Sequence, residues 1–378
     1  MSSASRIPIG PRLCVVLLAA CVLSLEFGLR EWGGFGRRVV SDVDGRYGIV
    51  LLPDQKVVSR NGRVPIRINS EGFRGQDWGP REPDPSLLRV AVLGDSMAYG
   101  SDVAEAETWP RRLEASLSAW LQARGDPRRA QVLNGSRPGS ASPQKLLVYE
   151  DALRARAPDV IVYALAPHDV QRLPRLESDA VRSPWRDFLL RTAIYDFAVR
   201  QVVRGGVLRI DANGNEVEWS RHNKAVLAQP FADEHRTDWD ALGSRLDTLR
   251  RELEGRGALL LIVPNPILQP QREPHVAQLS KRVDAWAEPL ARCRVETHRP
   301  FQADLFKATT AFHAAGLSLD AIWSDGSRRE LSDAAAALVD GSRVDYPYLP
   351  KDMGHLSSAG HARLATVVFD ALLERLDG

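Results

Sequence analysis

Apolar runs of strand length alternate with helical patterns from about residue 87 to the C-terminus. The short runs Arg89–Leu93 and Ala258–Val263 are rich in branched apolar residues and predict buried strands. Between them, Thr108–Leu121 and Asp238–Leu253 carry apolar residues at helical spacing. Strands that alternate with helices are typical of a parallel sheet with helices on both faces. The pattern predicts an α/β domain of three layers, α/β/α, with a central and mostly parallel sheet.

The longest apolar run lies near the N-terminus, from Leu13 to Leu29, and is interrupted late by Glu26. As a helix it would be about 25 Å long, the short end of what crosses a bilayer. Arg6 and Arg12 before the run favour a cytoplasmic N-terminus, although arginines after the run weaken this asymmetry. The pattern predicts a signal-anchor or transmembrane helix over residues 1–30, with the rest of the chain in the periplasm or at the cell surface.

Other interpretations of this run stay open. A cleaved signal peptide would also place the remainder outside the cytoplasm. Leu18-Ala19-Ala20-Cys21 resembles a lipobox, but the bulky apolar residues after Cys21 are unusual in a lipoprotein signal. A buried helix of a soluble protein would leave the chain in the cytoplasm. Its position behind arginines at the extreme N-terminus argues against that interpretation.

Changes in composition predict the remaining boundaries. Residues 31–86 are rich in Gly, Arg and Pro and read as a juxtamembrane linker, with one short strand at Val64–Asn69. A Gly-Pro pair and a charged stretch then predict a domain that begins near residue 87 and includes residue 378. At about 171–235 we expect an insertion with an amphipathic helix, Trp185–Val203, and a hairpin turned at Asp211–Asn215. This insertion would either cover the active-site crevice or pack against the flank of the domain or the membrane.

Composition excludes several classes of protein. Fifty Lys and Arg residues against 48 Asp and Glu leave a formal charge of +2, and without a long basic block we expect no nucleic-acid partner. Three cysteines, two of them in the apolar run, exclude a disulfide scaffold, and we expect Cys293 to be a buried structural thiol. With no metal-ligand spacing, phosphate loop or dinucleotide fingerprint in the sequence, we expect no metal and no cofactor.

Two short motifs suggest nucleophilic catalysis. Gly94-Asp95-Ser96 follows the first predicted strand, at the carboxyl end where ligands bind in open α/β sheets. As an isolated tripeptide it would be an ordinary turn. Pro264-Asn265-Pro266 follows the strand predicted at Ala258–Val263 and should form a loop that faces the same crevice. Near the C-terminus, Asp352 precedes His355 by three residues, in a predicted loop that leads into a helix at about His361–Leu376. Such an Asp can hold the imidazole in one tautomer, so that the other ring nitrogen accepts a serine proton. Alone, His355 could equally cap the next helix.

Together, these motifs resemble the first and last blocks of the SGNH (GDSL) hydrolases. Val132–Gly139 resembles the second block, whose final glycine offers a backbone N–H to an oxyanion, and Ala157–Tyr163 resembles the strand before the third. Thr108–Pro110 and Ile68–Gly75 are similar to features of membrane-anchored bacterial members. The resemblance implies a flavodoxin-like fold and a catalytic triad of Ser96, Asp352 and His355.

The third block departs from the family pattern. Where the family has Asn followed by Asp, the chain reads Ala166-Pro167-His168-Asp169. The family's Asn donates a side-chain N–H to the oxyanion, and a His can donate from a longer side chain of different shape. The resemblance therefore implies an oxyanion hole of the Ser96 and Gly139 amides, with His168 as a third donor whose reach is in question.

The sequence predicts a membrane-anchored serine esterase that hydrolyses or transfers O-acyl groups through an acyl-serine intermediate. Its substrate would be an ester, with acylated cell-surface polysaccharide suggested by analogy with anchored relatives. The alternative is a catalytically impaired protein of the same fold that binds carbohydrate or acts as a scaffold, and His168 motivates that alternative.

Overall fold

A four-stranded parallel sheet forms the centre of the computed structural model. Its strands lie in the order β6 (Arg129–Asn134), β5 (Leu87–Leu93), β7 (Val160–Leu165), β8 (Leu259–Pro264), and all three neighbouring pairs are parallel. Numbered along the chain, this order is 2-1-3-4, which is the order of flavodoxin-like doubly wound sheets. The structure describes residues 10–32, 35–36, 39, 41–44, 47–59, 64–171, 184–204, 229–266, 275–323, 330–350 and 352–377.

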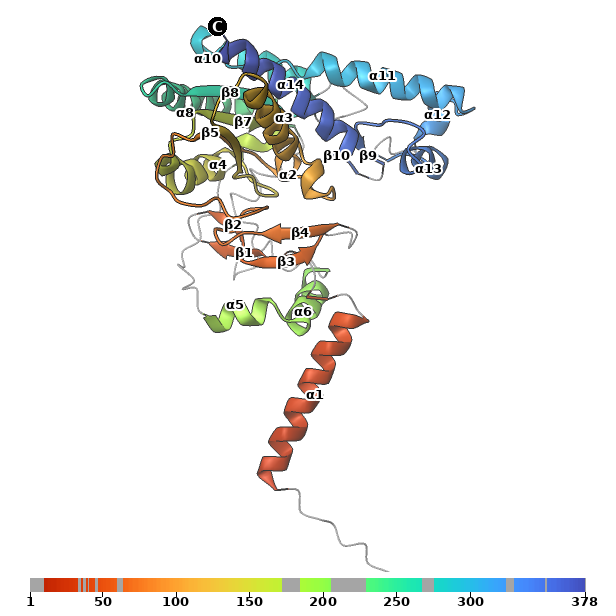
Figure 1. Cartoon of the computed structure of the whole chain (residues 1–378). Coiled ribbons are helices and arrows are strands. Elements are labelled where there is room, and N and C mark those ends of the chain that lie inside the picture. Colours follow the sequence, from red (N-terminus) through yellow and green to blue (C-terminus); the bar gives the residue numbers. More distant parts are fainter. Residues whose placement is uncertain are drawn as a thin grey trace, which may run out of the picture.

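Helices cover both faces of the sheet, so the predicted three-layer architecture is confirmed (Figure 1). Successive residues of a strand point to opposite faces. Val90 and Val92 of β5 therefore pack on one face, and Ala91 and Leu93 pack on the other. The first face packs against α3 (Trp109–Ala123), α11 (His298–Ala314), α12 (Leu319–Ile322), α13 (Asp333–Asp340) and α14 (Ser358–Leu376). The second packs against α4 (Ser142–Val148), α8 (Arg236–Glu254), α9 (His275–Asp284) and α10 (Glu288–Ala291).

The segment before the sheet contains four short strands. β1 (Ser41–Asp44) pairs with β2 (Gly48–Leu51), and β3 (Gln55–Val58) pairs with β4 (Pro65–Ile68), both antiparallel. β4 confirms the strand predicted at residues 64–69. In Figure 1 these strands lie between the parallel sheet and the helices α5 (Pro184–Leu190) and α6 (Ala193–Arg204).

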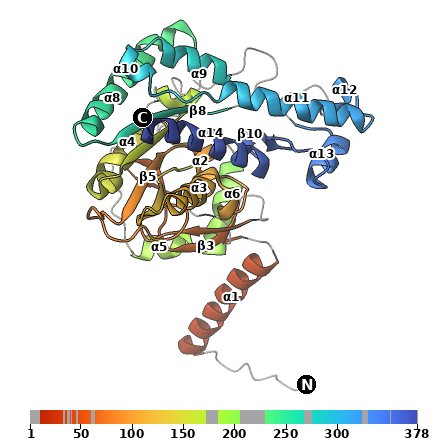
Figure 2. The same ribbon diagram turned by 45° about the horizontal axis from the view of Figure 1, so that its top comes forward.

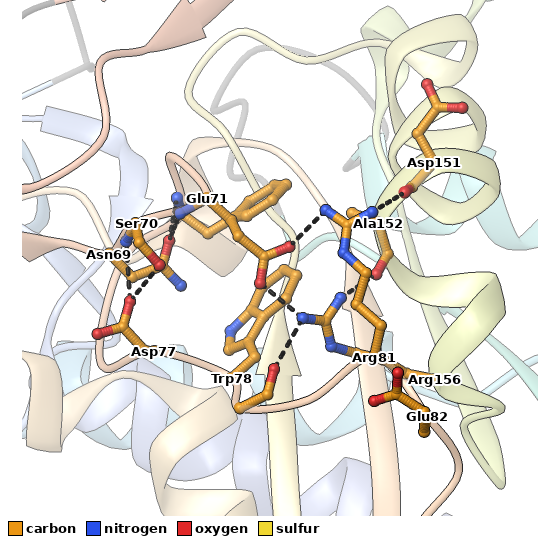
Figure 3. A network of polar contacts seen from close by, with 12 residues as sticks. Asn69, Ser70, Glu71, Asp77, Trp78, Arg81, Glu82, Asp151, Ala152 and Arg156 are labelled. Atoms are coloured by element: carbon orange, nitrogen blue, oxygen red, sulfur yellow. Dashed lines mark hydrogen bonds and ion pairs between the residues drawn. The ribbon is translucent and has the colours of Figure 1, made fainter.

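A polar network fastens this segment to the α/β domain (Figure 3). The Glu71 carboxylate pairs with Arg156 at 2.6 Å and with Arg81 at 3.1 Å, and Arg81 donates to the Asp151 carbonyl at 3.3 Å. The Arg156 side chain is almost fully buried and lies over the Trp78 ring. Residues 69–82 are therefore bonded to the domain, while the predicted domain boundaries stay predictions.

The predicted helix of the insertion is divided into α5 and α6. The division occurs at Thr192, whose hydroxyl donates to the Leu189 carbonyl at 2.8 Å and accepts from the Tyr195 amide at 3.1 Å. Thr192 thus ends one helix and caps the next, as threonine does at helix starts. The predicted hairpin at 211–215 lies outside the described residues. The two described helices lie at the base of the body, beside the end of α1 (Pro11–Glu31) (Figures 1 and 2).

Helix α1 extends away from the body and is long and apolar enough over Leu13–Glu31 to cross a membrane. None of that span is buried inside the structure, which is unlike the core helix of a soluble protein. A signal sequence near an N-terminus has the same properties. The helix is therefore a candidate span, and its retention in the membrane is a proposal.

Candidate active site

Ser96 is the first residue of the short helix α2 (Ser96–Tyr99), directly after β5. Asp95 caps this helix because its carboxylate accepts from the Met97 amide at 3.0 Å. A side chain at Gly94 would overlap Ala98 and come within 2.8 Å of Ser136 Oγ, so only glycine fits there. Asp95 and Met97 are buried, but Ser96 is half-exposed. Ser96 is therefore placed at a helix N-terminus with solvent access.

Asp352 and His355 lie in strand β10 (Asp352–Leu356), which packs against α2. The sequence predicted a loop here. The structure instead pairs β10 with β9 (Tyr348–Leu349), with an irregular register between Asp352 and Leu356. His355 is half-buried in this strand. The fold thus brings the strand of the predicted base against the helix of the predicted nucleophile, while the triad itself stays a prediction.

His361 belongs to α14, as predicted, and its ring is buried. Its Nδ1 accepts from the Trp109 amide at 3.2 Å, at the start of α3. Burial, with Arg74, Arg112 and His355 nearby, lowers the pKa of His361 to about 3. His361 is therefore neutral at ordinary pH and has a structural contact rather than a place in the predicted chemistry.

His168 lies in the 3₁₀ helix η4 (Pro167–Val170), directly after β7. Its Nε2 is 3.2 Å from the Ser140 carbonyl and 3.4 Å from Asp95 Oδ2. Both partners are acceptors when Asp95 is ionised, so Nε2 carries the proton. In a neutral ring Nδ1 is then an acceptor, and the Nε2 proton alone is available for an oxyanion.

Gly139, the other predicted oxyanion donor, is exposed and has a φ of +75°. A Cβ at this position would meet no atom within 4 Å, so space does not demand glycine. The positive φ does, because side chains other than glycine are disfavoured in that conformation. The backbone from Ser136 to Ser140 is tied to the first block, since the Arg137 amide donates to the Gly94 carbonyl at 3.3 Å.

Buried polar groups support these loops from below. Asn265, in the loop after β8, donates to both oxygens of Asp95, at 3.2 and 3.1 Å. This contact agrees with the prediction that the Pro264–Pro266 loop faces the crevice. Next to His168, the Lys145 ammonium is 2.7 Å from Asp169 Oδ1, and both side chains are almost completely buried. Burial raises the pKa of Asp169, and the charge of Lys145 opposes that rise.

Arg74 connects the N-terminal segment to the helix of Ser96. Its guanidinium donates to the carbonyls of Tyr99 at 3.0 Å and Val103 at 2.6 Å, and also to the Gly100 carbonyl. These are carbonyls at and beyond the C-terminal end of α2, where a helix leaves its last acceptors unsatisfied. Neither Arg74 nor Lys145 was singled out as a site residue, because a buried cation has no distinctive pattern in a single sequence.

No group of three His, Cys, Asp or Glu side chains that could hold a metal ion occurs in the described part of the chain. Cys293 was predicted to be buried, but it is only half-buried. Its Sγ donates to the Pro289 carbonyl at 3.5 Å. Burial raises the pKa of this thiol to about 11, so it stays protonated and unreactive near neutral pH.

No family model matches the sequence, and no match was found among curated proteins. Among solved structures, the chain is similar to a protein described as a GDSL-like lipase from Parabacteroides merdae, with 12% identity, a TM-score of 0.41 and coverage of 77% of this chain and 96% of that one. An acetyl xylan esterase has 12% identity, a TM-score of 0.39 and coverage of 75% and 100%. An acetylxylan esterase from Geobacillus stearothermophilus has 16% identity, a TM-score of 0.37 and coverage of 78% and 96%. The fold itself follows from the strand order of the sheet.

Proposed function

We propose that the chain is a serine esterase, acting as hydrolase or acyltransferase, with Ser96 as nucleophile. One observation carries the proposal: β10, with Asp352 and His355, packs against the helix that begins at Ser96. The proposal is supported because the three residue types of a hydrolytic triad then belong to adjoining elements at the carboxyl edge of the sheet. Such edges are where open α/β sheets bind ligands.

In the proposed reaction, Ser96 Oγ attacks the ester carbonyl while His355 takes its proton and Asp352 orients the imidazole. The amides of Ser96 and Gly139 hold the oxyanion, with the Nε2 proton of His168 as a third donor. His355 then returns the proton to the leaving alcohol, which departs and leaves an acyl-serine. Water, or a sugar hydroxyl in a transferase, releases the acyl group and returns the serine proton.

A second candidate is a catalytically impaired protein that binds carbohydrate or acts as a scaffold. The specific observation in its favour is His168, whose Nε2 proton lies between the Ser140 carbonyl and Asp95. A hole without a third donor would lose on the order of 10²–10³ in rate. Turnover of p-nitrophenyl acetate and binding of acylated oligosaccharides, measured on the full chain in nanodiscs, separate the two candidates.

We further propose that α1 is retained as a membrane anchor, with the α/β domain outside the cytoplasm. The protein should then stay in the membrane fraction after carbonate washing, with its domain open to external protease. A soluble mature protein that starts after Cys21 would contradict this proposal in favour of cleavage. An acylated Cys21 would favour the lipoprotein interpretation. The proposed substrate, an O-acylated surface glycan, is tested by release of acetate from acetylated oligosaccharides.

The nucleophile is tested with a fluorophosphonate on the full chain. Ser96→Ala should abolish labelling and ester turnover without unfolding the protein, because the side chain is half-exposed and has little packing to lose. Ser101→Ala is the matched control, five residues further along the chain in the turn after α2, and should keep both. Labelling that persists in the Ser96→Ala protein would contradict the assignment.

A further inference from the structure

Helix α5 exposes a cluster of large apolar side chains. Trp185 is 77% exposed, Phe188 60% and Leu189 55%, whereas Leu190 is buried. The rings of Trp185 and Phe188 meet edge to face, with centroids 6.5 Å apart. Contiguous exposed apolar side chains on a soluble body mark a surface that binds something. The apolar surface of α5 is therefore expected to have a binding partner.

The end of α1 is bonded to the start of α6, which follows α5 directly. The Glu26 carboxylate accepts from the Ala193 amide at 2.8 Å and the Ile194 amide at 3.0 Å. It thus satisfies free N–H groups at the start of α6, where negative charge is favoured. Arg30 pairs with Glu26 at 2.7 Å and donates to the Arg191 carbonyl at 2.9 Å. Glu26, the acidic residue that interrupts the apolar run, therefore caps α6 together with Thr192.

Further contacts hold α5 and α6 in place beside α1. The Gly36 amide donates to Asp196 Oδ2 at 2.8 Å, and the rings of Phe35 and Phe197 meet edge to face. On the other side, Arg191 donates to the Pro53 carbonyl at 2.7 Å, in the turn between β2 and β3. The corner between α5 and α6 is thus fixed both to the candidate span and to the body (Figure 1).

The end of α1 carries its own exposed aromatic side chains. Phe27 is 60% exposed and Trp32 is 87% exposed, and their rings meet at 6.3 Å. Aromatic residues, tryptophan above all, are enriched where a span leaves the hydrocarbon and enters the headgroup region. In Figure 1, α6 lies between α5 and this end of α1, and both helices lie on the side of the body from which α1 extends.

We propose that Trp185, Phe188 and Leu189 of α5, together with Phe27 and Trp32 of α1, form an aromatic surface that rests in the interface of the bilayer that α1 crosses. The occupant of this surface is lipid, because the surface continues from a candidate span through direct hydrogen bonds. The body would then contact the membrane at two places, and its orientation to the bilayer would be fixed. This inference rests on the proposed anchoring, but not on the proposed esterase activity.

The test uses the full chain in nanodiscs of phosphatidylethanolamine and phosphatidylglycerol. A fraction of the lipid carries a photoreactive diazirine in its acyl chain, and labelled residues are mapped by mass spectrometry. We expect labels on α1 and on Trp185, Phe188 and Leu189. Phe306 is the matched control, since it is 74% exposed and its helix α11 lies on the side of the body away from α1 (Figures 1 and 2). It should carry no label above background.

Trp185→Ser combined with Phe188→Ser should reduce labelling at Leu189 to the level of Phe306, while Phe306→Ser should leave it unchanged. Labelled α1 with α5 at background would overturn the inference and leave the anchoring intact. An unlabelled α1 would overturn the anchoring and this inference together.

Discussion

The carboxyl edge of the sheet and the base of the molecule use ion pairs in different surroundings. At the edge, Lys145 and Asp169 keep only 1% and 0% of their side chains exposed. At the base, Arg30 and Glu26 keep 36% and 21%. A buried ion that loses its partner is strongly unfavourable, whereas an exposed pair is screened by water and contributes little. The loss of one partner should therefore cost much more free energy at the carboxyl edge than at the base. The contacts that join α1 to the base are the weaker of the two.

The largest effect is expected from Lys145→Met, which tests the rigid side of this comparison. It leaves the Asp169 carboxylate buried and unpaired, so the free energy of unfolding should fall by about 3–5 kcal/mol. Denaturant titration of the full chain measures this loss. The double variant with Asp169→Asn should recover much of the stability, because no buried charge remains. A single variant with wild-type stability would show that the pair is not buried.

A second prediction concerns His168, which lies next to the Lys145–Asp169 pair at the carboxyl edge. Its Nε2 contacts, at 3.2 and 3.4 Å, are long, so the same N–H can turn to an oxyanion. We expect His168→Ala to lower kcat by about 10²-fold or more with little change in KM, and His168→Asn to retain or raise activity. If alanine is harmless, the hole consists of the Ser96 and Gly139 amides. If asparagine raises turnover by two orders of magnitude or so, the natural protein is an impaired enzyme.

A third prediction concerns the edge at low pH. The pKa of His361 is about 3 in the folded chain and near 6.5 when unfolded, so below pH 6.5 only the unfolded state takes up the proton. Its contribution to stability should be complete above pH 6.5 and should fall by about 1.4 kcal/mol per pH unit as the pH drops towards 3. His361→Asn should flatten the stability curve over this range. The exposed His313→Asn should leave it as steep as in the parent.

The smallest effect is expected at the base, from Glu26→Gln. It removes the negative charge from the start of α6 but keeps an acceptor, which costs about 0.3–1 kcal/mol. Global stability should hardly change. Amide hydrogen exchange at Ala193 and Ile194 should speed up severalfold, while exchange in α14 stays constant. Exchange that is unchanged at both amides would show that Glu26 does not cap this helix.

The sequence predicted the parts of the fold whose pattern is local. β8 is a continuous apolar run, and β5 is apolar apart from Arg89, because both faces of the sheet are covered. The helices α3 and α8 each present an apolar stripe at helical spacing. β1 to β3 were not predicted, because four-residue strands of mixed polarity carry too little periodicity. β10 was predicted as a loop for the same reason, since Asp352–Leu356 contains a glycine and no alternation.

In the candidate site, too, only the features that depend on local sequence could be predicted. Ser96 and Asn265 were placed correctly at strand ends, because that position follows from the strands themselves. Contacts between distant segments could not be predicted. Lys145 reaches Asp169 across 24 residues, and Glu26 reaches Ala193 across 167, and neither pairing leaves a trace in one sequence. The triad of Ser96, Asp352 and His355 stays a prediction that rests on the resemblance.

The bonds from Arg74 to the end of α2 bear on how the gene can be divided. A fragment cloned from Leu87 onwards would encode the whole parallel sheet and all the proposed catalytic residues. It would lack the guanidinium that holds the carbonyls of Tyr99, Gly100 and Val103. A unit that recombines between genes must therefore begin before Arg74 and not near residue 87. Recombination near residue 87 would separate the helix of Ser96 from the guanidinium that binds its C-terminal end.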